Sequence, residues 1–200
     1  MTEHSQKDKI GIKLGMWLFL YTEIMLFGGL FVLYAAYHQT YTADFVQAGK
    51  ELNLAFGTVN TIFLLCSSCA VAASITAVRK GASRLAIKLL VGAVSLGLVF
   101  MVNKFFEWSS KFAHGIYPNS SVLTKGEPGV NVFFGLYYIV TGLHGVHVLI
   151  GMILLAFCAV KVRSGQVRAD DYVLLDNCGL YWHLVDLIWI FVFPLFYLIV

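Results

Sequence analysis

Four of the ionisable side chains that fall inside strongly apolar stretches of the sequence are candidates for chemistry. Glu23 lies in "WLFLYTEIMLFGGLF", His144 and His147 lie in "TGLHGVHVLIG", and Asp186 lies in "YWHLVDLIWIFVF". An ionised group in hydrocarbon is costly, so such residues are rare and usually either bond between helices or handle protons. For Glu23 the residues leave both readings open: a neutral carboxyl that joins two helices, or a group that takes up and releases a proton.

A haem held between two helices needs histidines at matching depths, and the spacing of these histidines does not provide them. His144 and His147 are three residues apart and share one helix face. His183 lies about 6 Å from the start of the run 179–200, which is the end away from the depth of His144. His38 and His114 fall outside the runs. We therefore expect no cofactor and no metal on this chain, and we expect the histidines to hydrogen-bond between helices.

The elements that must position these side chains are membrane-spanning helices. Hydrophobic residues make up 59% of the 200 residues and charged residues 12%, with a mean hydropathy of +0.79, which is too apolar for a soluble domain. A helix needs about 20 apolar residues to cross a bilayer. Five runs meet this length: 14–37, 54–77, 85–106, 132–160 and 179–200. The sequence predicts an all-α integral membrane protein, a five-helix bundle that forms one membrane domain over 1–200.

The basic residues predict the orientation of the chain. Ten of the fourteen Lys and Arg lie in the N-terminal tail, in the loop between the second and third spans, or in the loop between the fourth and fifth spans. Basic loops stay in the cytoplasm, so we expect the N-terminus inside and the C-terminus outside. The same placement accounts for the pI of about 8.6. We expect no nucleic-acid partner, because the charges sit in short loops and form no binding motif.

Three segments, in this order, resemble subunit III of the haem–copper cytochrome c oxidases. They are "GMWLFLYTEIMLFGGLFVLYAAYH" (15–38), "GLHGVHVLIG" (142–151) and "YWHLVDLIWIFVFPLFYL" (181–198). The segment "FFEW" (105–108) is similar to the end of the same family's third span. The chain resembles the five-helix form of the family, which lacks the first two helices of the seven-helix form and the lipid-filled cleft that they make.

The resemblance implies a subunit without a redox centre of its own. Such a subunit packs on oxidase subunit I, in a complex with subunit II, and supports proton uptake and active-site stability during O2 reduction. Haem and copper are then expected on the partner subunits. The resemblance places the family's buried carboxylate on Glu23, its buried histidine in the pair His144 and His147, and its buried aspartate on Asp186.

The resemblance also implies a location and a lipid partnership. The chain is expected in the bacterial cytoplasmic (inner) membrane as a multi-pass protein. Lys13, Lys161 and Arg163 are the candidates for contacts with phospholipid headgroups.

The depths of His147 and Asp186, about 20 Å and about 10 Å from the inner edge, each lie within about one helical turn, 5.4 Å, of the depth of Glu23, about 14 Å. On that ground we expect Glu23, His147 and Asp186 to approach one another in the bundle core. The cluster would act first as a clamp between helices and only second as a proton-handling site.

Alternative readings remain from the same superfamily and from another class. Subunit III of a quinol oxidase, and the related small subunit of a nitric oxide reductase, also resemble this chain. The pair Thr22 and Glu23 favours the cytochrome c oxidase branch, since those relatives more often have Asp there. A small proton or ion transporter is the alternative from another class. Transporters often show internal repeats or broken helices, and the sequence shows neither.

Overall fold

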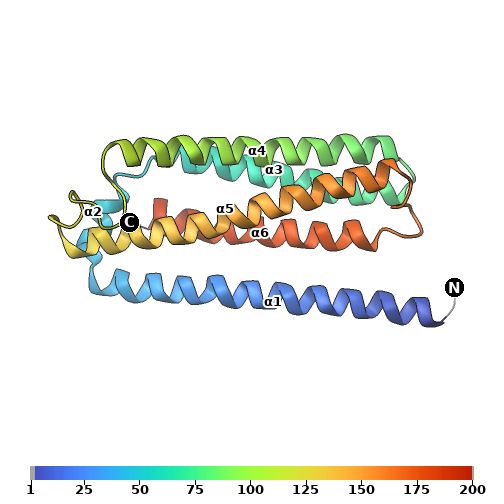
Figure 1. Ribbon diagram of the computed structural model, residues 1–200, viewed down its shortest axis with the longest axis horizontal. Coiled ribbons are helices and arrows are strands. Elements are labelled where there is room, and N and C mark those ends of the chain that lie inside the picture. Colours follow the sequence, from blue (N-terminus) through green and yellow to red (C-terminus); the bar gives the residue numbers. More distant parts are fainter. Residues whose placement is uncertain (1–2, 200) are drawn as a thin grey trace.

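The computed structural model describes residues 3–199, with side chains for residues 10–199. In this range the chain is helical, without a β-strand. The helices are α1 (Glu3–Thr40), α2 (Thr42–Gly49), α3 (Leu54–Arg79), α4 (Ser83–Ala113), α5 (Pro128–Arg163) and α6 (Val173–Tyr197). Among the described residues, all of these except α2 are long and apolar enough to cross a membrane. The predicted all-α membrane fold with five spans is therefore confirmed (Figure 1).

Each of the first four predicted spans lies within one helix that extends beyond the apolar run. The fifth span was expected from residue 179, but α6 begins at Val173, so its first turn includes Asp176. A polar first turn suits a helix that starts in the interface, outside the hydrocarbon, where hydropathy gives no signal. Helix α6 ends at Tyr197, three residues before the predicted end at Val200, which itself lies outside the described residues. The short helix α2 was not predicted, because eight residues are too few to show a period.

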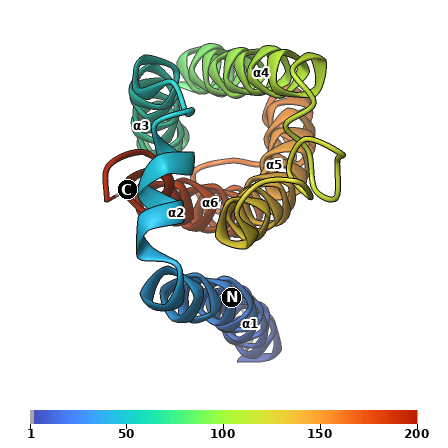
Figure 2. The same cartoon turned by 90° about the vertical axis from the view of Figure 1, so that its left-hand side faces the viewer.

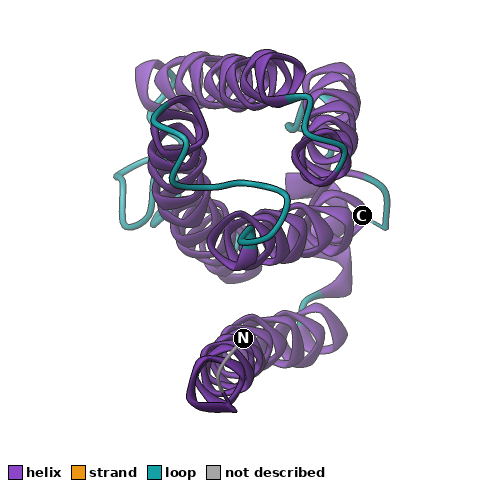
Figure 3. Ribbon diagram, turned by 90° about the vertical axis from the view of Figure 1, so that its right-hand side faces the viewer, coloured by secondary structure: helices purple, strands orange, loops and turns teal. Residues whose placement is uncertain are grey.

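Helices α3, α4, α5 and α6 surround a common core, and α1 lies outside them (Figures 2 and 3). Consecutive spans run in opposite directions, so the loops between α3 and α4 and between α5 and α6 lie at the same end of the bundle as the start of α1 (Figure 1). We call this the basic end, because most Lys and Arg lie there. The loop between α3 and α4 is only three residues long and turns at Gly81, whose φ of 75° favours glycine.

A glycine lets α5 and α6 approach each other closely. A Cβ atom added at Gly151 would lie 2.6 Å from Cε3 of Trp182, whose indole is almost fully buried in the core. Small residues commonly allow such approaches between membrane helices. This contact fixes the rotation of α5 against α6, and with it the direction in which the side chains one turn before Gly151 project.

Candidate functional site

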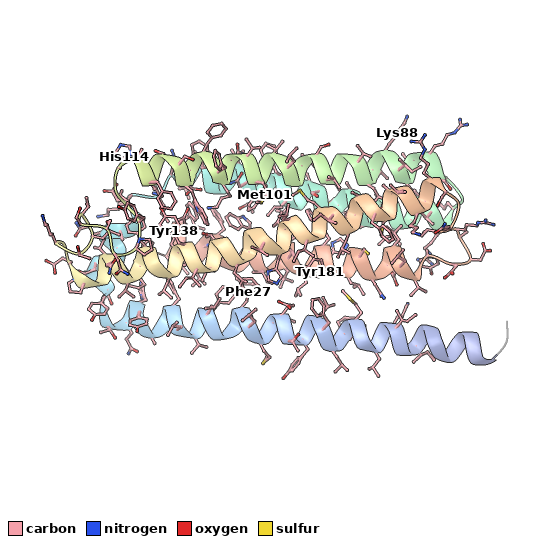
Figure 4. The ribbon with its side chains drawn as sticks, in the orientation of Figure 1. Phe27, Lys88, Met101, His114, Tyr138 and Tyr181 are labelled. Atoms are coloured by element: carbon pink, nitrogen blue, oxygen red, sulfur yellow. The ribbon has the colours of Figure 1, made fainter. Side chains whose placement is uncertain are left out.

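Glu23 of α1 and His147 of α5 form a direct contact between the outer helix and the bundle. Glu23 Oε2 lies 2.8 Å from His147 Nε2, and the two side chains are 14% and 11% exposed. Phe27 packs edge-on against the imidazole at 5.3 Å, and Tyr181 of α6 lies on its other side at 6.4 Å. Figure 4 shows Phe27 and Tyr181 between α1 and the bundle. The imidazole of the pair is thus in contact with aromatic rings from both α1 and α6.

The hydrogen bonds of His147 determine the chemistry of the pair. His147 Nδ1 lies 2.8 Å from the carbonyl oxygen of Leu143, which can only accept, so Nδ1 carries a hydrogen. In a neutral imidazole Nε2 is then an acceptor, and it donates only as part of an imidazolium. The contact with Glu23 therefore contains one proton, held either by the carboxyl or by the imidazole. A pair of this kind can bind a proton and pass it between two atoms.

The pair lines a groove between α1 and the bundle. The groove has a volume of about 350 Å³, and its walls come from α1, α5 and α6. Towards the basic end it is lined by Asn177 and Cys178. Lys13 Nζ forms an ion pair with Asp176 at this end, at 3.2 Å.

At the opposite end the Tyr34 hydroxyl donates to the Leu195 carbonyl at 2.5 Å. Helix α1 is therefore attached to the bundle by polar contacts at three levels, with Glu23 in the middle one.

Asp186 lies in a different environment from Glu23. Its carboxyl interacts with Ser68 of α3, and the Ser68 hydroxyl lies 2.6 Å from His183 Nδ1. Asp186 points away from Glu23 because it follows Tyr181 by five residues, which places it about 140° further round α6. Tyr181 therefore faces α1 and α5, whereas Asp186 faces α3. Glu23, His147 and Asp186 have similar depths, but only Glu23 and His147 contact each other.

His144 faces the bundle core rather than α1. It is fully buried between the rings of Phe100 and Trp189, with centroids 5.6 and 5.1 Å away. Neither ring nitrogen has a hydrogen-bond partner. It shares the helix with His147 but not its contact. In the described part of the chain, no group of three or more His, Cys, Asp or Glu could hold a metal ion.

A second polar network lies within the bundle, and the sequence did not reveal it. Lys104 and Glu107 of α4 are three residues apart, and they are only 7% and 6% exposed. Lys104 Nζ donates to Glu107 Oε2 at 3.0 Å, to Tyr137 Oη at 3.1 Å and to Tyr197 Oη at 3.0 Å.

The two tyrosines complete this network. Both hydroxyls donate to Glu107 Oε1, from Tyr137 at 2.8 Å and from Tyr197 at 2.6 Å. All three ammonium donors and both carboxylate oxygens are therefore satisfied by α4, α5 and α6. To identify Tyr137 and Tyr197 as partners of Lys104 and Glu107, one must know the register between α4, α5 and α6. A single sequence does not give this register.

The candidate lipid-contacting residues all lie at the basic end. Lys13 is paired with Asp176, as described above. Lys161 Nζ donates to Gln166 Oε1 at 2.7 Å and lies 5.1 Å from the ring centroid of Phe157. Arg163, two residues further, is exposed and lines a separate groove between α4 and α5.

The sequence was compared with known families and curated proteins. It matches the family described as cytochrome c oxidase subunit III over residues 1–199. It is 27% identical to the haem–copper oxidase subunit I+III of Aeropyrum pernix, over 98% of this chain and 24% of that protein. It is 30% identical to cytochrome c oxidase subunit 3 of Thermostichus vulcanus, over 93% of this chain and 86% of that protein. It is 32% identical to the probable quinol oxidase subunit 3 of Staphylococcus saprophyticus, over 94% and 88%. The chain thus spans about a quarter of the fused relative.

Proposed function

Because the chain belongs to the cytochrome c oxidase subunit III family, we propose that it is the non-catalytic third subunit of a haem–copper respiratory terminal oxidase. In this role it packs on subunit I, in a complex that includes subunit II, in a bacterial cytoplasmic membrane with its N-terminus inside. Haem and copper reside on the partner subunits. The relative in which subunits I and III form one chain supports the packing against subunit I.

The observation that carries the role in proton uptake is the contact between Glu23 and His147. The pair holds one proton between a carboxyl and an imidazole, inside a groove between α1 and the bundle. Proton transfer between two such atoms needs no movement of either helix. We propose that the pair exchanges protons in support of uptake towards the active site of subunit I.

The same contact supports a role in the stability of the complex. Helix α1 buries few of its apolar side chains in the bundle, so its position depends strongly on its polar contacts. A buried carboxyl without a partner is costly, so the pair favours the docked position of α1. We propose that the clamp maintains the surface presented to subunit I, and that phospholipids fill the remaining exposed faces.

The electron donor has two candidates. Cytochrome c is favoured by the family description and by the relative from Thermostichus vulcanus. Quinol is the second candidate, because the probable quinol oxidase subunit 3 of Staphylococcus saprophyticus has comparable identity and coverage.

Purification of the tagged chain in mild detergent tests the proposal. We expect subunits I and II to co-purify with it, and the haem absorption spectrum to belong to the complex rather than to the separated chain. Oxygen consumption with reduced cytochrome c, compared with quinol, then identifies the donor. Purification of the chain without any haem-containing partner would refute the proposed function.

A further inference from the structure

A second groove lies between α4 and α5 at the basic end. Helix α4 lies on the opposite side of the bundle from α1 (Figure 2). The volume of the groove is about 310 Å³, and almost all of its lining is apolar. The lining includes Ile87, Val91 and Val94 of α4 and Ala156, Ala159 and Arg163 of α5. The two alanines are short, so they leave space that larger side chains would fill. The groove therefore offers an apolar surface with a cation at one end.

The extent of the groove suits a lipid chain. Along α4 its lining runs from Ile87 to Ser95, about 12 Å at 1.5 Å per residue. This is less than half of the roughly 30 Å hydrocarbon core of a bilayer. The groove thus lies within the leaflet at the basic end, where one acyl chain of a phospholipid would run parallel to the helices.

One basic residue, Arg163, lines this groove, and two more lie on α4 within one helical turn of lining residues. Arg163 lines it directly, whereas Arg84 and Lys88 each precede a lining residue of α4, Ile87 or Val91, by three positions and so share its helix face. All three are exposed (Figure 4 labels Lys88). Among the described side chains, none of the three forms an ion pair. The adjoining segments 83–98 and 149–163 contain no Asp or Glu.

We propose that this groove binds a phospholipid with a net negative charge. One acyl chain packs on Ala156 and Ala159, and the phosphate contacts Arg163 together with Arg84 or Lys88. Basic pockets between membrane helices recognise anionic headgroups in this way. The site differs from the surroundings of Lys161, whose ammonium group is bound to Gln166 about 200° round the helix from Arg163. The proposal deepens the lipid partnership of the proposed function, but it does not depend on the identity of the oxidase.

Native mass spectrometry of the purified complex tests the site. Phosphatidylglycerol or phosphatidylcholine is titrated into the detergent solution, and bound lipid is counted. Arg163→Gln removes one cation, and Ala156→Phe fills the groove from an exposed position. Lys125→Gln and Ala73→Phe are the matched controls, because Lys125 is an exposed lysine far from the basic end and Ala73 is an exposed alanine of α3. The same spectra report which subunits are present, so a failure of the proposed oxidase complex would be visible separately.

We expect Arg163→Gln to weaken phosphatidylglycerol binding about fivefold, which corresponds to about 1 kcal/mol for one basic residue near an anionic lipid. Binding of phosphatidylcholine should not change with this variant. Ala156→Phe should remove the bound phosphatidylglycerol, and both controls should retain it. Equal binding of the two lipids, or an equal loss in Lys125→Gln, would overturn the proposal. So would release of a partner subunit, rather than lipid, by Ala156→Phe.

Discussion

The hydrogen bond from His147 to the Leu143 carbonyl determines what Glu23 can do. It fixes the hydrogen on Nδ1, so Nε2 and the Glu23 carboxyl must share a single proton. The carboxyl is then neutral, or it is paired with an imidazolium, and in either state it has a partner in the apolar groove. The sequence left two roles open for Glu23, a helix clamp and a proton-handling group. The contact with His147 is compatible with both roles.

Substitution of Glu23 tests the clamp. Glu23→Gln should leave the subunit on the complex, because the amide can still donate to Nε2. Glu23→Leu leaves a buried acceptor unpaired, at a cost of about 1–3 kcal/mol, and should release the subunit at lower detergent concentration. The measurement is the fraction of subunit retained during detergent washing. Met25→Leu, at an exposed position of α1, is the control. Equal retention of the Gln and Leu variants would contradict the clamp.

Lys104 and Glu107 give a second prediction, because both side chains are buried and all of their charged donors and acceptors are hydrogen-bonded. Lys104→Met leaves the carboxylate without its cation and should destabilise the chain by about 3–5 kcal/mol. The double variant Lys104→Met with Glu107→Gln removes both charges and should recover much of this loss. Thermal unfolding of the purified complex, followed by release of this subunit, measures the difference. Additive losses in the double variant would show that the two charges do not stabilise each other.

At the scale of elements, the sequence predicted the spans well and the contacts between them poorly. Apolar length identifies a membrane helix, because the bilayer imposes the same requirement on every span. Residues such as Asp186 and Lys104 depend instead on how each helix is rotated towards its neighbours. Depth pointed equally to Glu23, His147 and Asp186, and only the rotation of the helices decides that Glu23 contacts His147 while Asp186 faces α3. Helix α2 lies outside the spans and has no comparable signal.

The close approach of α5 and α6 gives a prediction for a single methyl group. Gly151→Ala places a Cβ against the Trp182 indole and should destabilise the bundle by about 1–3 kcal/mol. Gly135→Ala is the matched control on the same helix, because a Cβ there meets nothing within 4 Å. This change should be neutral or stabilising by up to about 1 kcal/mol, since alanine favours helix. The thermal stability of each variant in detergent is the measurement, and similar behaviour of the two would refute the packing argument.

For the whole molecule, the placement of basic residues predicts the orientation in the membrane. We expect the basic end in the cytoplasm and the C-terminus outside. A reporter enzyme that works only outside the cytoplasm should therefore be active when fused to the C-terminus. A fusion at the loop between α3 and α4 is the control and should be inactive. Activity confined to the loop fusion would reverse the orientation.

The most direct test of the central claim compares the oxidase with and without this chain over many turnovers. The chain is proposed to support proton uptake and to protect an active site that lies on subunit I. Oxygen consumption should therefore begin in the complex that lacks the chain and should then decline early, while the complete complex continues. Restoring the chain should restore sustained turnover. A complex without the chain that kept full activity over the same number of turnovers would contradict the account.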